Sequence, residues 1–582
     1  ELPSPTFWLG CTCRICTAGK TIIFYCIAER TEGDDMFTNP ECWGREAYEG
    51  MCTWEFDGYQ YQIYEESLKL KCMYNVLKQT AEKTPDRVAL IDNWGHQCTY
   101  RELLEKSDRF AEYLKDVIKV KHGDRVGMML YNSIELCVMF IAVSKLGAVC
   151  VSLPTKFKQE EIHSLVEMAG TTGIICNEEY ADWFSEQKIK GCFILPVGNG
   201  EKEYGFSRYE VIKDHYCSCA GKLEDTAIIL FTSGTTSRSK GAQLRNFNVL
   251  HAVIAYQKIL HVKPDDKTLT PTPIYHITGM IAIFSLYVYA GACVYLFRKF
   301  DPAKIVDTVR KERITFIHST PTVFIKLLEE KLPGETLECV TALACGSSSM
   351  PVQKIKELHE WMPNMKFHTC YGLTETTSVG STFPEDAAVS PYCGSSGCPA
   401  PGLQFAIWDE KGNEVPTGQY GEIVICGAAI LCNYLNMKSD LIEDHWLHTG
   451  DIGYFNEDGY IWIVDRKKDM INYGGEKVPS FDIENAVYRI PEVKECAVFG
   501  VKDEVYGEIV GAAIALHEGK ILTKNDVMNY LKPLLAKYKI PKIIEFMDEI
   551  PKTENGKINK KYLRKYFNEK YANKDQNAGK PV

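Results

Sequence analysis

The chain has 582 residues, of which 45% are hydrophobic and 25% charged, and its formal net charge is −11. This length exceeds what a single hydrophobic core usually serves, so we expect two or more folded domains. The composition excludes a low-complexity chain, and the acidic balance argues against a general nucleic-acid-binding protein.

Residues 1–71 are predicted to form a cysteine-rich N-terminal extension whose role the sequence leaves open. The "CTCRIC" sequence lacks the second cysteine pair or the histidines that a zinc site needs. Cysteines elsewhere lie in apolar runs such as "GAVCVSL", where a free thiol behaves as a small hydrophobic side chain. We therefore interpret the cysteines as incidental free thiols in a reducing compartment, and expect a cytoplasmic protein.

From residue 72 onward, helical patterns alternate with short apolar strands. "YRELLEKSDRFAEYLKDVI" has helical periodicity, whereas "RVGMML" and "AVCVSL" are typical of buried strands. This alternation predicts an α/β domain with a parallel sheet covered by helices. The strand "TAIILF" leads into "FTSGTTSRSKG", a loop rich in hydroxyl and amide donors of the kind that holds phosphate.

The uncharged segment 280–297, "MIAIFSLYVYAGACVYLF", just reaches the length of a candidate membrane span. A Gly-Ala pair divides it, and its second half is rich in β-branched and aromatic residues. We therefore predict a buried helix that is followed by a buried strand, and no transmembrane segment.

The pattern of predicted secondary structure changes in the second half of the chain. The strand "KFHTC" runs into a second loop, "YGLTET". Short strands separated by turns predict a β-rich subdomain over about 395–465, and a small α/β unit follows. The expected domains are 72–467 and 468–570, with a polar, disordered tail at 571–582.

Several motifs occur in one order, and together they resemble those of the adenylate-forming superfamily, which includes acyl-CoA synthetases. The motifs are "FTSGTTSRSKG", "PIYHITG", "YGLTETT", "HTGDIGYFNEDGYIWIVDRKKD", "GGEKVPSFDIE" and "PKTENGKI". The resemblance covers roughly residues 72–568. It implies a large N-terminal domain of parallel-sheet α/β subdomains plus a β-rich subdomain, with a small, mobile C-terminal α/β domain.

The resemblance also implies a set of ATP and AMP contacts. They are Thr232, Ser233, Gly234, Thr235, Thr236, Lys240, Gly346, Ser347, Tyr371, Gly372, Asp451 and Arg466. The loop residues would cradle the β- and γ-phosphates, Tyr371 would stack on adenine, and Asp451 with Arg466 would contact the ribose. Ser237 and Ser239 depart from the glycine and proline that are commonest in the family. Neither change removes a phosphate donor.

The resemblance assigns the chemistry to three further positions. Thr374 would contact the α-phosphate, and Glu375 would bind Mg²⁺, which accepts a single carboxylate together with phosphate and water. Lys557 would bridge the carboxylate and the α-phosphate as adenylation proceeds. The surrounding lysines are otherwise typical of a solvated surface, so only the motif distinguishes Lys557.

Four positions of the resemblance concern domain movement and the incoming thiol. Lys468 matches the hinge about which the small domain rotates between half-reactions. Gly474, Gly475 and Glu476 would then approach the pantetheine tunnel, where missing Cβ atoms leave room for a thin chain.

The implied reaction converts a carboxylic acid and ATP into an acyl-adenylate, and then transfers the acyl group to coenzyme A. His276, in "PIYHITG", would line the acyl pocket, and the absence of an acidic residue beside it favours a plain fatty or aryl acid over an amino acid. A stand-alone adenylation enzyme that loads a carrier protein stays an alternative. An inactive acyl- or nucleotide-binding homologue is a second one. The sequence leaves the acid and the oligomeric state open.

Overall fold

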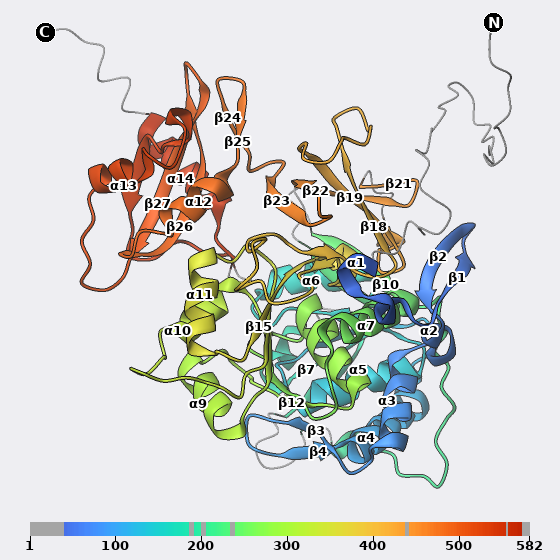
Figure 1. The fold of residues 1–582 in the computed structure, drawn as a ribbon. Helices are drawn as coiled ribbons and strands as arrows, with labels where there is room; N and C mark the ends of the chain where they lie inside the picture. Colours follow the sequence, from blue (N-terminus) through green and yellow to red (C-terminus); the bar gives the residue numbers. More distant parts are fainter. Residues whose placement is uncertain are drawn as a thin grey trace, which may run out of the picture.

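The computed structural model describes residues 40–184, 191–198, 205, 207–232, 239–436, 441–553 and 557–572. Two bodies are visible in Figure 1: a large one built from three mixed sheets, one antiparallel sheet and a two-stranded hairpin, and a smaller one at the C-terminus. The expected mixed α/β fold with a separate C-terminal domain is confirmed.

The main sheet of the large body has seven strands. Its order is β20 (Asn433–Tyr434), β10 (Lys240–Arg245), β9 (Thr226–Thr232), β6 (Val149–Ser152), β5 (Arg125–Met129), β7 (Gly173–Asn177) and β8 (Phe193–Val197). The strands from β9 to β8 are parallel. Strand β10 joins antiparallel to β9, and β20 joins antiparallel to β10. Because the carboxyl ends of parallel strands meet at one edge, this edge is where a ligand site is expected.

Two further sheets complete the α/β part of the large body. One has the order β11 (Lys267–Leu269), β12 (Cys293–Tyr295), β3 (Val88–Ile91) and β4 (Gln97–Thr99). The other has the order β13 (Phe316–Ser319), β14 (Ala342–Cys345), β15 (Lys366–Tyr371), β16 (Ser381–Thr382) and β17 (Cys398–Pro399). In both sheets the first three strands are parallel.

Helices cover these sheets, as expected for an α/β domain. They are α3 (Met73–Lys83), α4 (Tyr100–Tyr113), α5 (Ile134–Lys145), α6 (Gln159–Ala169), α7 (Asn246–Leu260), α8 (Leu286–Ala290), α9 (Pro302–Glu312), α10 (Pro321–Leu328) and α11 (Val352–Trp361). Helix α4 begins with a capping box in which Thr99 and Glu102 satisfy each other's backbone N–H groups. Segment 280–297 folds as the end of a π-helix (Thr278–Ser285), then α8, then β12, which confirms the buried helix followed by a strand. No helix among the described residues is long and apolar enough to cross a membrane.

The predicted β-rich subdomain is present as an antiparallel sheet. It contains β18 (Leu403–Trp408), β19 (Gly421–Gly427), β22 (Trp446–Phe455), β21 (Ile442–Glu443) and β23 (Ile461–Arg466). Its last strand leads directly into the small domain. That domain contains β24 (Ile471–Tyr473), β25 (Glu476–Val478), α12 (Ser480–Val487), β26 (Val493–Asp503), β27 (Gly507–Leu516), α13 (Lys524–Leu531), β28 (Ile543–Phe546) and α14 (Lys560–Ala572).

The segment before residue 72 packs into the large body. It forms α1 (Pro40–Trp43), the hairpin of β1 (Met51–Phe56) and β2 (Tyr59–Tyr64), and α2 (Glu65–Leu70). The Trp54 ring lies 5.2 Å from that of Phe247 on α7, and the Trp43 indole N–H donates to the carbonyl of Pro399. From residue 43 onward, therefore, the predicted extension contributes to the main hydrophobic core. Helix α14 includes Tyr571 and Ala572, the first two residues of the expected tail.

One expectation about the cysteines is wrong. Cys42 and Cys398 form a disulfide, although they are 356 residues apart in the sequence. The fold brings them together because α1 lies against β17, a proximity that no local pattern encodes. Other described cysteines, such as Cys137 and Cys150, are buried free thiols, as expected.

Candidate active site

The loop of hydroxyl residues connects two antiparallel strands at the carboxyl edge of the main sheet. Thr232 ends β9 and faces Lys240 at the start of β10. Ser233, Gly234, Thr235 and Thr236 lie outside the described residues. The hairpin therefore fixes both ends of the loop, and it holds the Lys240 ammonium at the loop's exit.

The second loop brings Thr374 and Glu375 to the same edge. They form a short 3₁₀ turn directly after β15. Gly372 allows this turn, because a Cβ atom there would lie 1.8 Å from the carbonyl oxygen of Ser378. The Glu375 carboxylate accepts a hydrogen bond of 2.8 Å from the Tyr434 hydroxyl.

Tyr434 is a site residue that sequence reasoning missed. The Lys240 ammonium lies 5.4 Å from the centre of its ring, and its hydroxyl donates to Glu375. Tyr434 reaches both groups because β20 pairs with β10. It therefore connects the first loop with the second, and no motif in the sequence marks it.

Tyr371, Asp451 and Arg466 form a polar group in which Tyr371 and Asp451 are buried and the Arg466 side chain is 43% exposed. The Tyr371 hydroxyl donates to Asp451 Oδ2 at 2.8 Å, and Arg466 Nε lies 3.1 Å from Asp451 Oδ1. Asp451 and Arg466 face each other across β22 and β23, which explains why residues 15 positions apart form a pair. Burial raises the pKa of Asp451, and Arg466 and Tyr371 oppose this rise.

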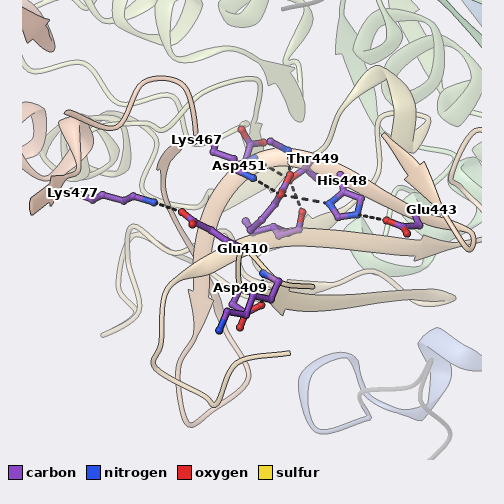
Figure 2. A network of polar contacts seen from close by, with 12 residues as sticks. Asp409, Glu410, Glu443, His448, Thr449, Asp451, Lys467 and Lys477 are labelled. Atoms are coloured by element: carbon purple, nitrogen blue, oxygen red, sulfur yellow. Dashed lines mark hydrogen bonds and ion pairs between the residues drawn. The ribbon is translucent and has the colours of Figure 1, made fainter. Parts of the chain in front are cut away.

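The part of β22 that carries Asp451 is itself held in place (Figure 2). The Asp451 N–H donates to the Thr449 hydroxyl oxygen at 3.1 Å. Glu422 accepts from the Gly450 N–H at 3.1 Å and from Lys467 Nζ at 3.1 Å, and His448 Nδ1 lies 3.5 Å from it. These contacts lie entirely on the large-domain side of residue 468.

Gly346 and Ser347 follow β14, beside the strand that precedes the second loop. A Cβ atom on Gly346 would lie 3.0 Å from the carbonyl oxygen of Cys370, so glycine permits this close approach. Ser347 has a φ of 72°, a left-handed conformation that non-glycine residues adopt infrequently. The turn therefore lies next to the strand that carries Tyr371.

His276 lies two residues before the π-helix, next to Tyr275, and their ring centres are 4.6 Å apart. Burial lowers its pKa to about 4, and the charges of Lys156 and Lys557 lower it further. The imidazole is therefore neutral at pH 7.

Lys557 belongs to the small domain, yet charged groups of the large domain act on its ammonium. It keeps contact with solvent, but partial desolvation and the positive charge of Arg466 lower its pKa to about 8. The negative charges of Asp451 and Glu375 raise the pKa of Lys557 and so oppose this lowering. The charge of Lys557 is thus coupled to three predicted residues of the large domain.

The hinge residue and the glycine turn lie elsewhere. The Lys468 carbonyl accepts from Arg564 Nη1 on α14 at 3.1 Å. Gly474 and Gly475 form the two-residue turn between β24 and β25, with φ of 57° and 95°, and Glu476 follows. Figure 1 shows this hairpin at the top of the small domain, away from α11. The described orientation therefore brings Lys557 to the site, but not Gly474, Gly475 or Glu476.

Ion pairs join the two domains in this orientation. Lys494 on β26 lies 3.0 Å from Glu329 at the end of α10. Lys477 on β25 lies 2.8 Å from Glu410 in the turn after β18, as Figure 2 shows. Both pairs are exposed to solvent, so each contributes little stability by itself.

Two family profiles match this sequence. The profile described as AMP-binding enzyme matches residues 77–435, and that described as AMP-binding enzyme C-terminal domain matches residues 482–557. The two matches correspond to the large and small domains of the structure.

Curated relatives of similar length align over most of the chain. A feruloyl-CoA synthase from an Amycolatopsis species is 28% identical over 84% of this chain and 97% of its own. A 2-succinylbenzoate–CoA ligase from Bacillus mycoides is 29% identical over 86% of this chain and 100% of its own.

Solved structures agree with the fold. ATP-bound MatB from Rhodopseudomonas palustris has a TM-score of 0.79 at 27% identity, over 86% of this chain and 99% of its own. O-succinylbenzoate coenzyme A synthetase from Bacillus subtilis, in complex with ATP and a magnesium ion, has a TM-score of 0.72 at 27% identity, over 84% and 98%.

Proposed function

Because this chain belongs to the AMP-binding enzyme family, we propose that it is an acid–CoA ligase that forms AMP. A carboxylate oxygen attacks the α-phosphorus of ATP, and the bond to pyrophosphate breaks. The thiol sulfur of coenzyme A then attacks the acyl carbon, and AMP leaves. The observation that carries this proposal is the contact of Tyr371 and Arg466 with Asp451, at a place where the charge of Lys557 from the small domain also acts.

The large domain supplies the nucleotide contacts in this proposal. Thr232 and Lys240 flank the phosphate loop, and the Asp451–Arg466 pair offers an acceptor and donors to the ribose hydroxyls. Tyr371 is largely buried, and its hydroxyl is engaged by Asp451, so its ring is fixed for contact with adenine. These groups bind and orient ATP whichever way the small domain faces.

Glu375 suits a magnesium–nucleotide complex. The Tyr434 hydroxyl orients the carboxylate, and no group of three or more His, Cys, Asp or Glu suited to a metal occurs among the described residues. A single carboxylate is sufficient for Mg²⁺, which takes its other ligands from phosphate and water. When bound, Mg²⁺ supplies positive charge to the phosphates during transfer.

Lys557 supplies the mobile cation of the adenylation step. Both reactants are anions, so a positioned ammonium between them offsets their repulsion and stabilises charge that develops in the transition state. Because its pKa is about 8, Lys557 is mostly protonated at pH 7. Thr374 directly precedes Glu375 in the sequence and offers a hydroxyl to the α-phosphate.

The acid itself is proposed to be a plain carboxylic acid, fatty or aryl. His276 is neutral at pH 7, and the charged neighbours that affect it, Lys156 and Lys557, are both positive. A substrate carboxylate suits such surroundings, whereas a substrate ammonium is repelled. The many buried free thiols fit a cytoplasmic enzyme, with Cys42–Cys398 as an exception.

The test is pyrophosphate release with a panel of fatty and aryl acids, each assayed with and without coenzyme A. We expect pyrophosphate from ATP and one class of acid, and an acyl-CoA product only when coenzyme A is present. An enzyme that releases pyrophosphate but forms no acyl-CoA would instead load another thiol. A protein that binds ATP yet releases no pyrophosphate with any acid would contradict the proposal.

A further inference from the structure

Helix α12 of the small domain begins at Ser480 and lacks a cap of its own. Pro479 precedes it, and no side chain within the helix's own first turn caps it. The first N–H groups of a helix need acceptors from outside the helix. Here the Ser480 N–H donates to Oδ2 of Asp465 at 2.7 Å. Asp465 is not in the small domain: it faces Ile452 across β23 and β22 of the large domain.

The Asp465 carboxylate is buried, with 1% of the residue exposed. Its Oδ1 accepts from the Arg466 N–H at 2.8 Å, and its Oδ2 accepts from Ser480. One carboxylate thus accepts from backbone groups on both sides of Lys468. A buried carboxylate that loses such a donor must find water or another donor.

The small domain also directs a buried cation toward this point. Lys560 Nζ lies 2.8 Å from Glu484 Oε1 and donates to the Ser480 hydroxyl at 2.6 Å. Burial alone would lower the pKa of Lys560, but attraction to Glu484 and Asp465 raises it above the usual value. The ammonium therefore stays charged and adds to the attraction between α12 and Asp465.

We propose that Asp465 is a positioning residue that holds the small domain in the orientation in which Lys557 reaches the nucleotide site. The inference rests on the proposed function for its effect on activity. If the small domain turns about Lys468, Ser480 moves with it while Asp465 stays on β23. The Ser480–Asp465 hydrogen bond must then break before the thiol-transfer step, and it favours the adenylation step while it lasts.

Position 480 offers a matched pair of variants. Ser480→Pro removes the N–H group that binds Asp465, and proline is well tolerated at the first position of a helix. Pro479, with ψ of 130°, already has the conformation preferred before proline. Ser480→Ala keeps the N–H group and removes only the hydroxyl that contacts Lys560. Asp465→Ala removes the acceptor from the large-domain side.

The first measurement needs no substrate. Hydrogen exchange followed by mass spectrometry would report on the first turn of α12 in the full-length protein. We expect Asp465→Ala to increase exchange there by about fivefold, the effect of losing one helix cap, without changing exchange in α6. Unchanged exchange at α12 would overturn the proposed contact, whether or not the protein is a ligase.

The second measurement compares the two half-reactions. In Asp465→Ala and Ser480→Pro, we expect adenylate formation from ATP and acid to slow by about fivefold. In the same two variants, thioester formation from pre-made acyl-adenylate should be unchanged or faster, and the KM for ATP should change less than about twofold. Ser480→Ala should behave as wild type in both half-reactions. Equal slowing of both steps, or identical behaviour of Ser480→Pro and Ser480→Ala, would overturn the positioning role. If the wild-type protein makes no adenylate, the proposed function is refuted. The hydrogen-exchange result would then still test the contact between Ser480 and Asp465.

Discussion

The nucleotide residues of the large domain and Lys557 of the small domain are held in contrasting ways. Asp451 is fixed by Tyr371, Arg466 and Thr449, all on its own side of the hinge. Lys557 reaches the same site only through the orientation of its whole domain. Nucleotide binding should therefore be insensitive to domain placement, whereas adenylation should depend on it. Each prediction below tests that division.

The largest effect should come from Lys557→Ala. We expect adenylate formation to fall by ~10²–10³, the usual effect of removing one positioned charge donor at a developing anion. The KM for ATP and thioester formation from synthetic acyl-adenylate should change little. Lys552→Ala is the matched control, because Lys552 pairs with Glu495 inside the small domain. Equal slowing of both half-reactions by Lys557→Ala would show that the two regions are not separable.

Glu375→Gln tests the contribution of the large domain to the use of Mg²⁺ and ATP. The amide oxygen can still accept from Tyr434, but the negative charge toward Mg²⁺ is lost. We expect the Mg²⁺ concentration for half-maximal rate to rise by on the order of tenfold, with little change in thermal stability. Tyr434→Phe should shift it in the same direction by less. Normal turnover of Glu375→Gln at limiting magnesium would remove this carboxylate from the metal site.

The pH dependence of adenylation should distinguish the role of Lys557 from that of the nucleotide-binding residues of the large domain. Lys557 has a lowered pKa of about 8, so its positive charge is present below that pH and is lost as the pH rises through it. The adenylation rate should therefore decline above pH 8, while ATP binding, measured by calorimetry, should not. The residual activity of Lys557→Ala should lack this decline. A decline that persists in the variant would belong to another group.

The smallest effect is expected from the exposed pair between the domains, Lys494 and Glu329. Because exposed ion pairs contribute about 0.2–1 kcal/mol, Lys494→Ala should slow adenylation by roughly twofold and leave thioester formation unchanged. Lys565→Ala, which breaks an exposed pair within α14, should alter neither step. A large effect of Lys494→Ala would mean that surface contacts, rather than the hinge region, hold the orientation.

The sequence predicted the architecture because it follows local patterns, and it indicated candidate site residues through the resemblance to family motifs. The alternation of helices and strands, the loop after β9 and the turn after β15 are all visible as short stretches of sequence. The assigned roles of the site residues stay predictions, and Ser233, Gly234, Thr235 and Thr236 lie outside the described residues.

Long-range contacts could not be predicted. Tyr434 reaches Glu375 through the pairing of β20 with β10, and Asp465 caps a helix that begins 15 residues later in another domain. Likewise, the packing of Trp54 on Phe247 depends on tertiary structure, because the hairpin of β1 and β2 has no motif that indicates its partner.

The disulfide between Cys42 and Cys398 makes the covalent connectivity of this protein differ from that of a linear chain. A proteolytic cut between these two residues would leave two fragments that separate on a gel only after reduction. In the chain-entropy description, a cross-link that closes a loop of this length disfavours the unfolded state by on the order of 5 kcal/mol. The melting temperature measured for this protein would thus depend on whether the buffer contains a thiol reductant, even though neither sulfur touches the nucleotide site.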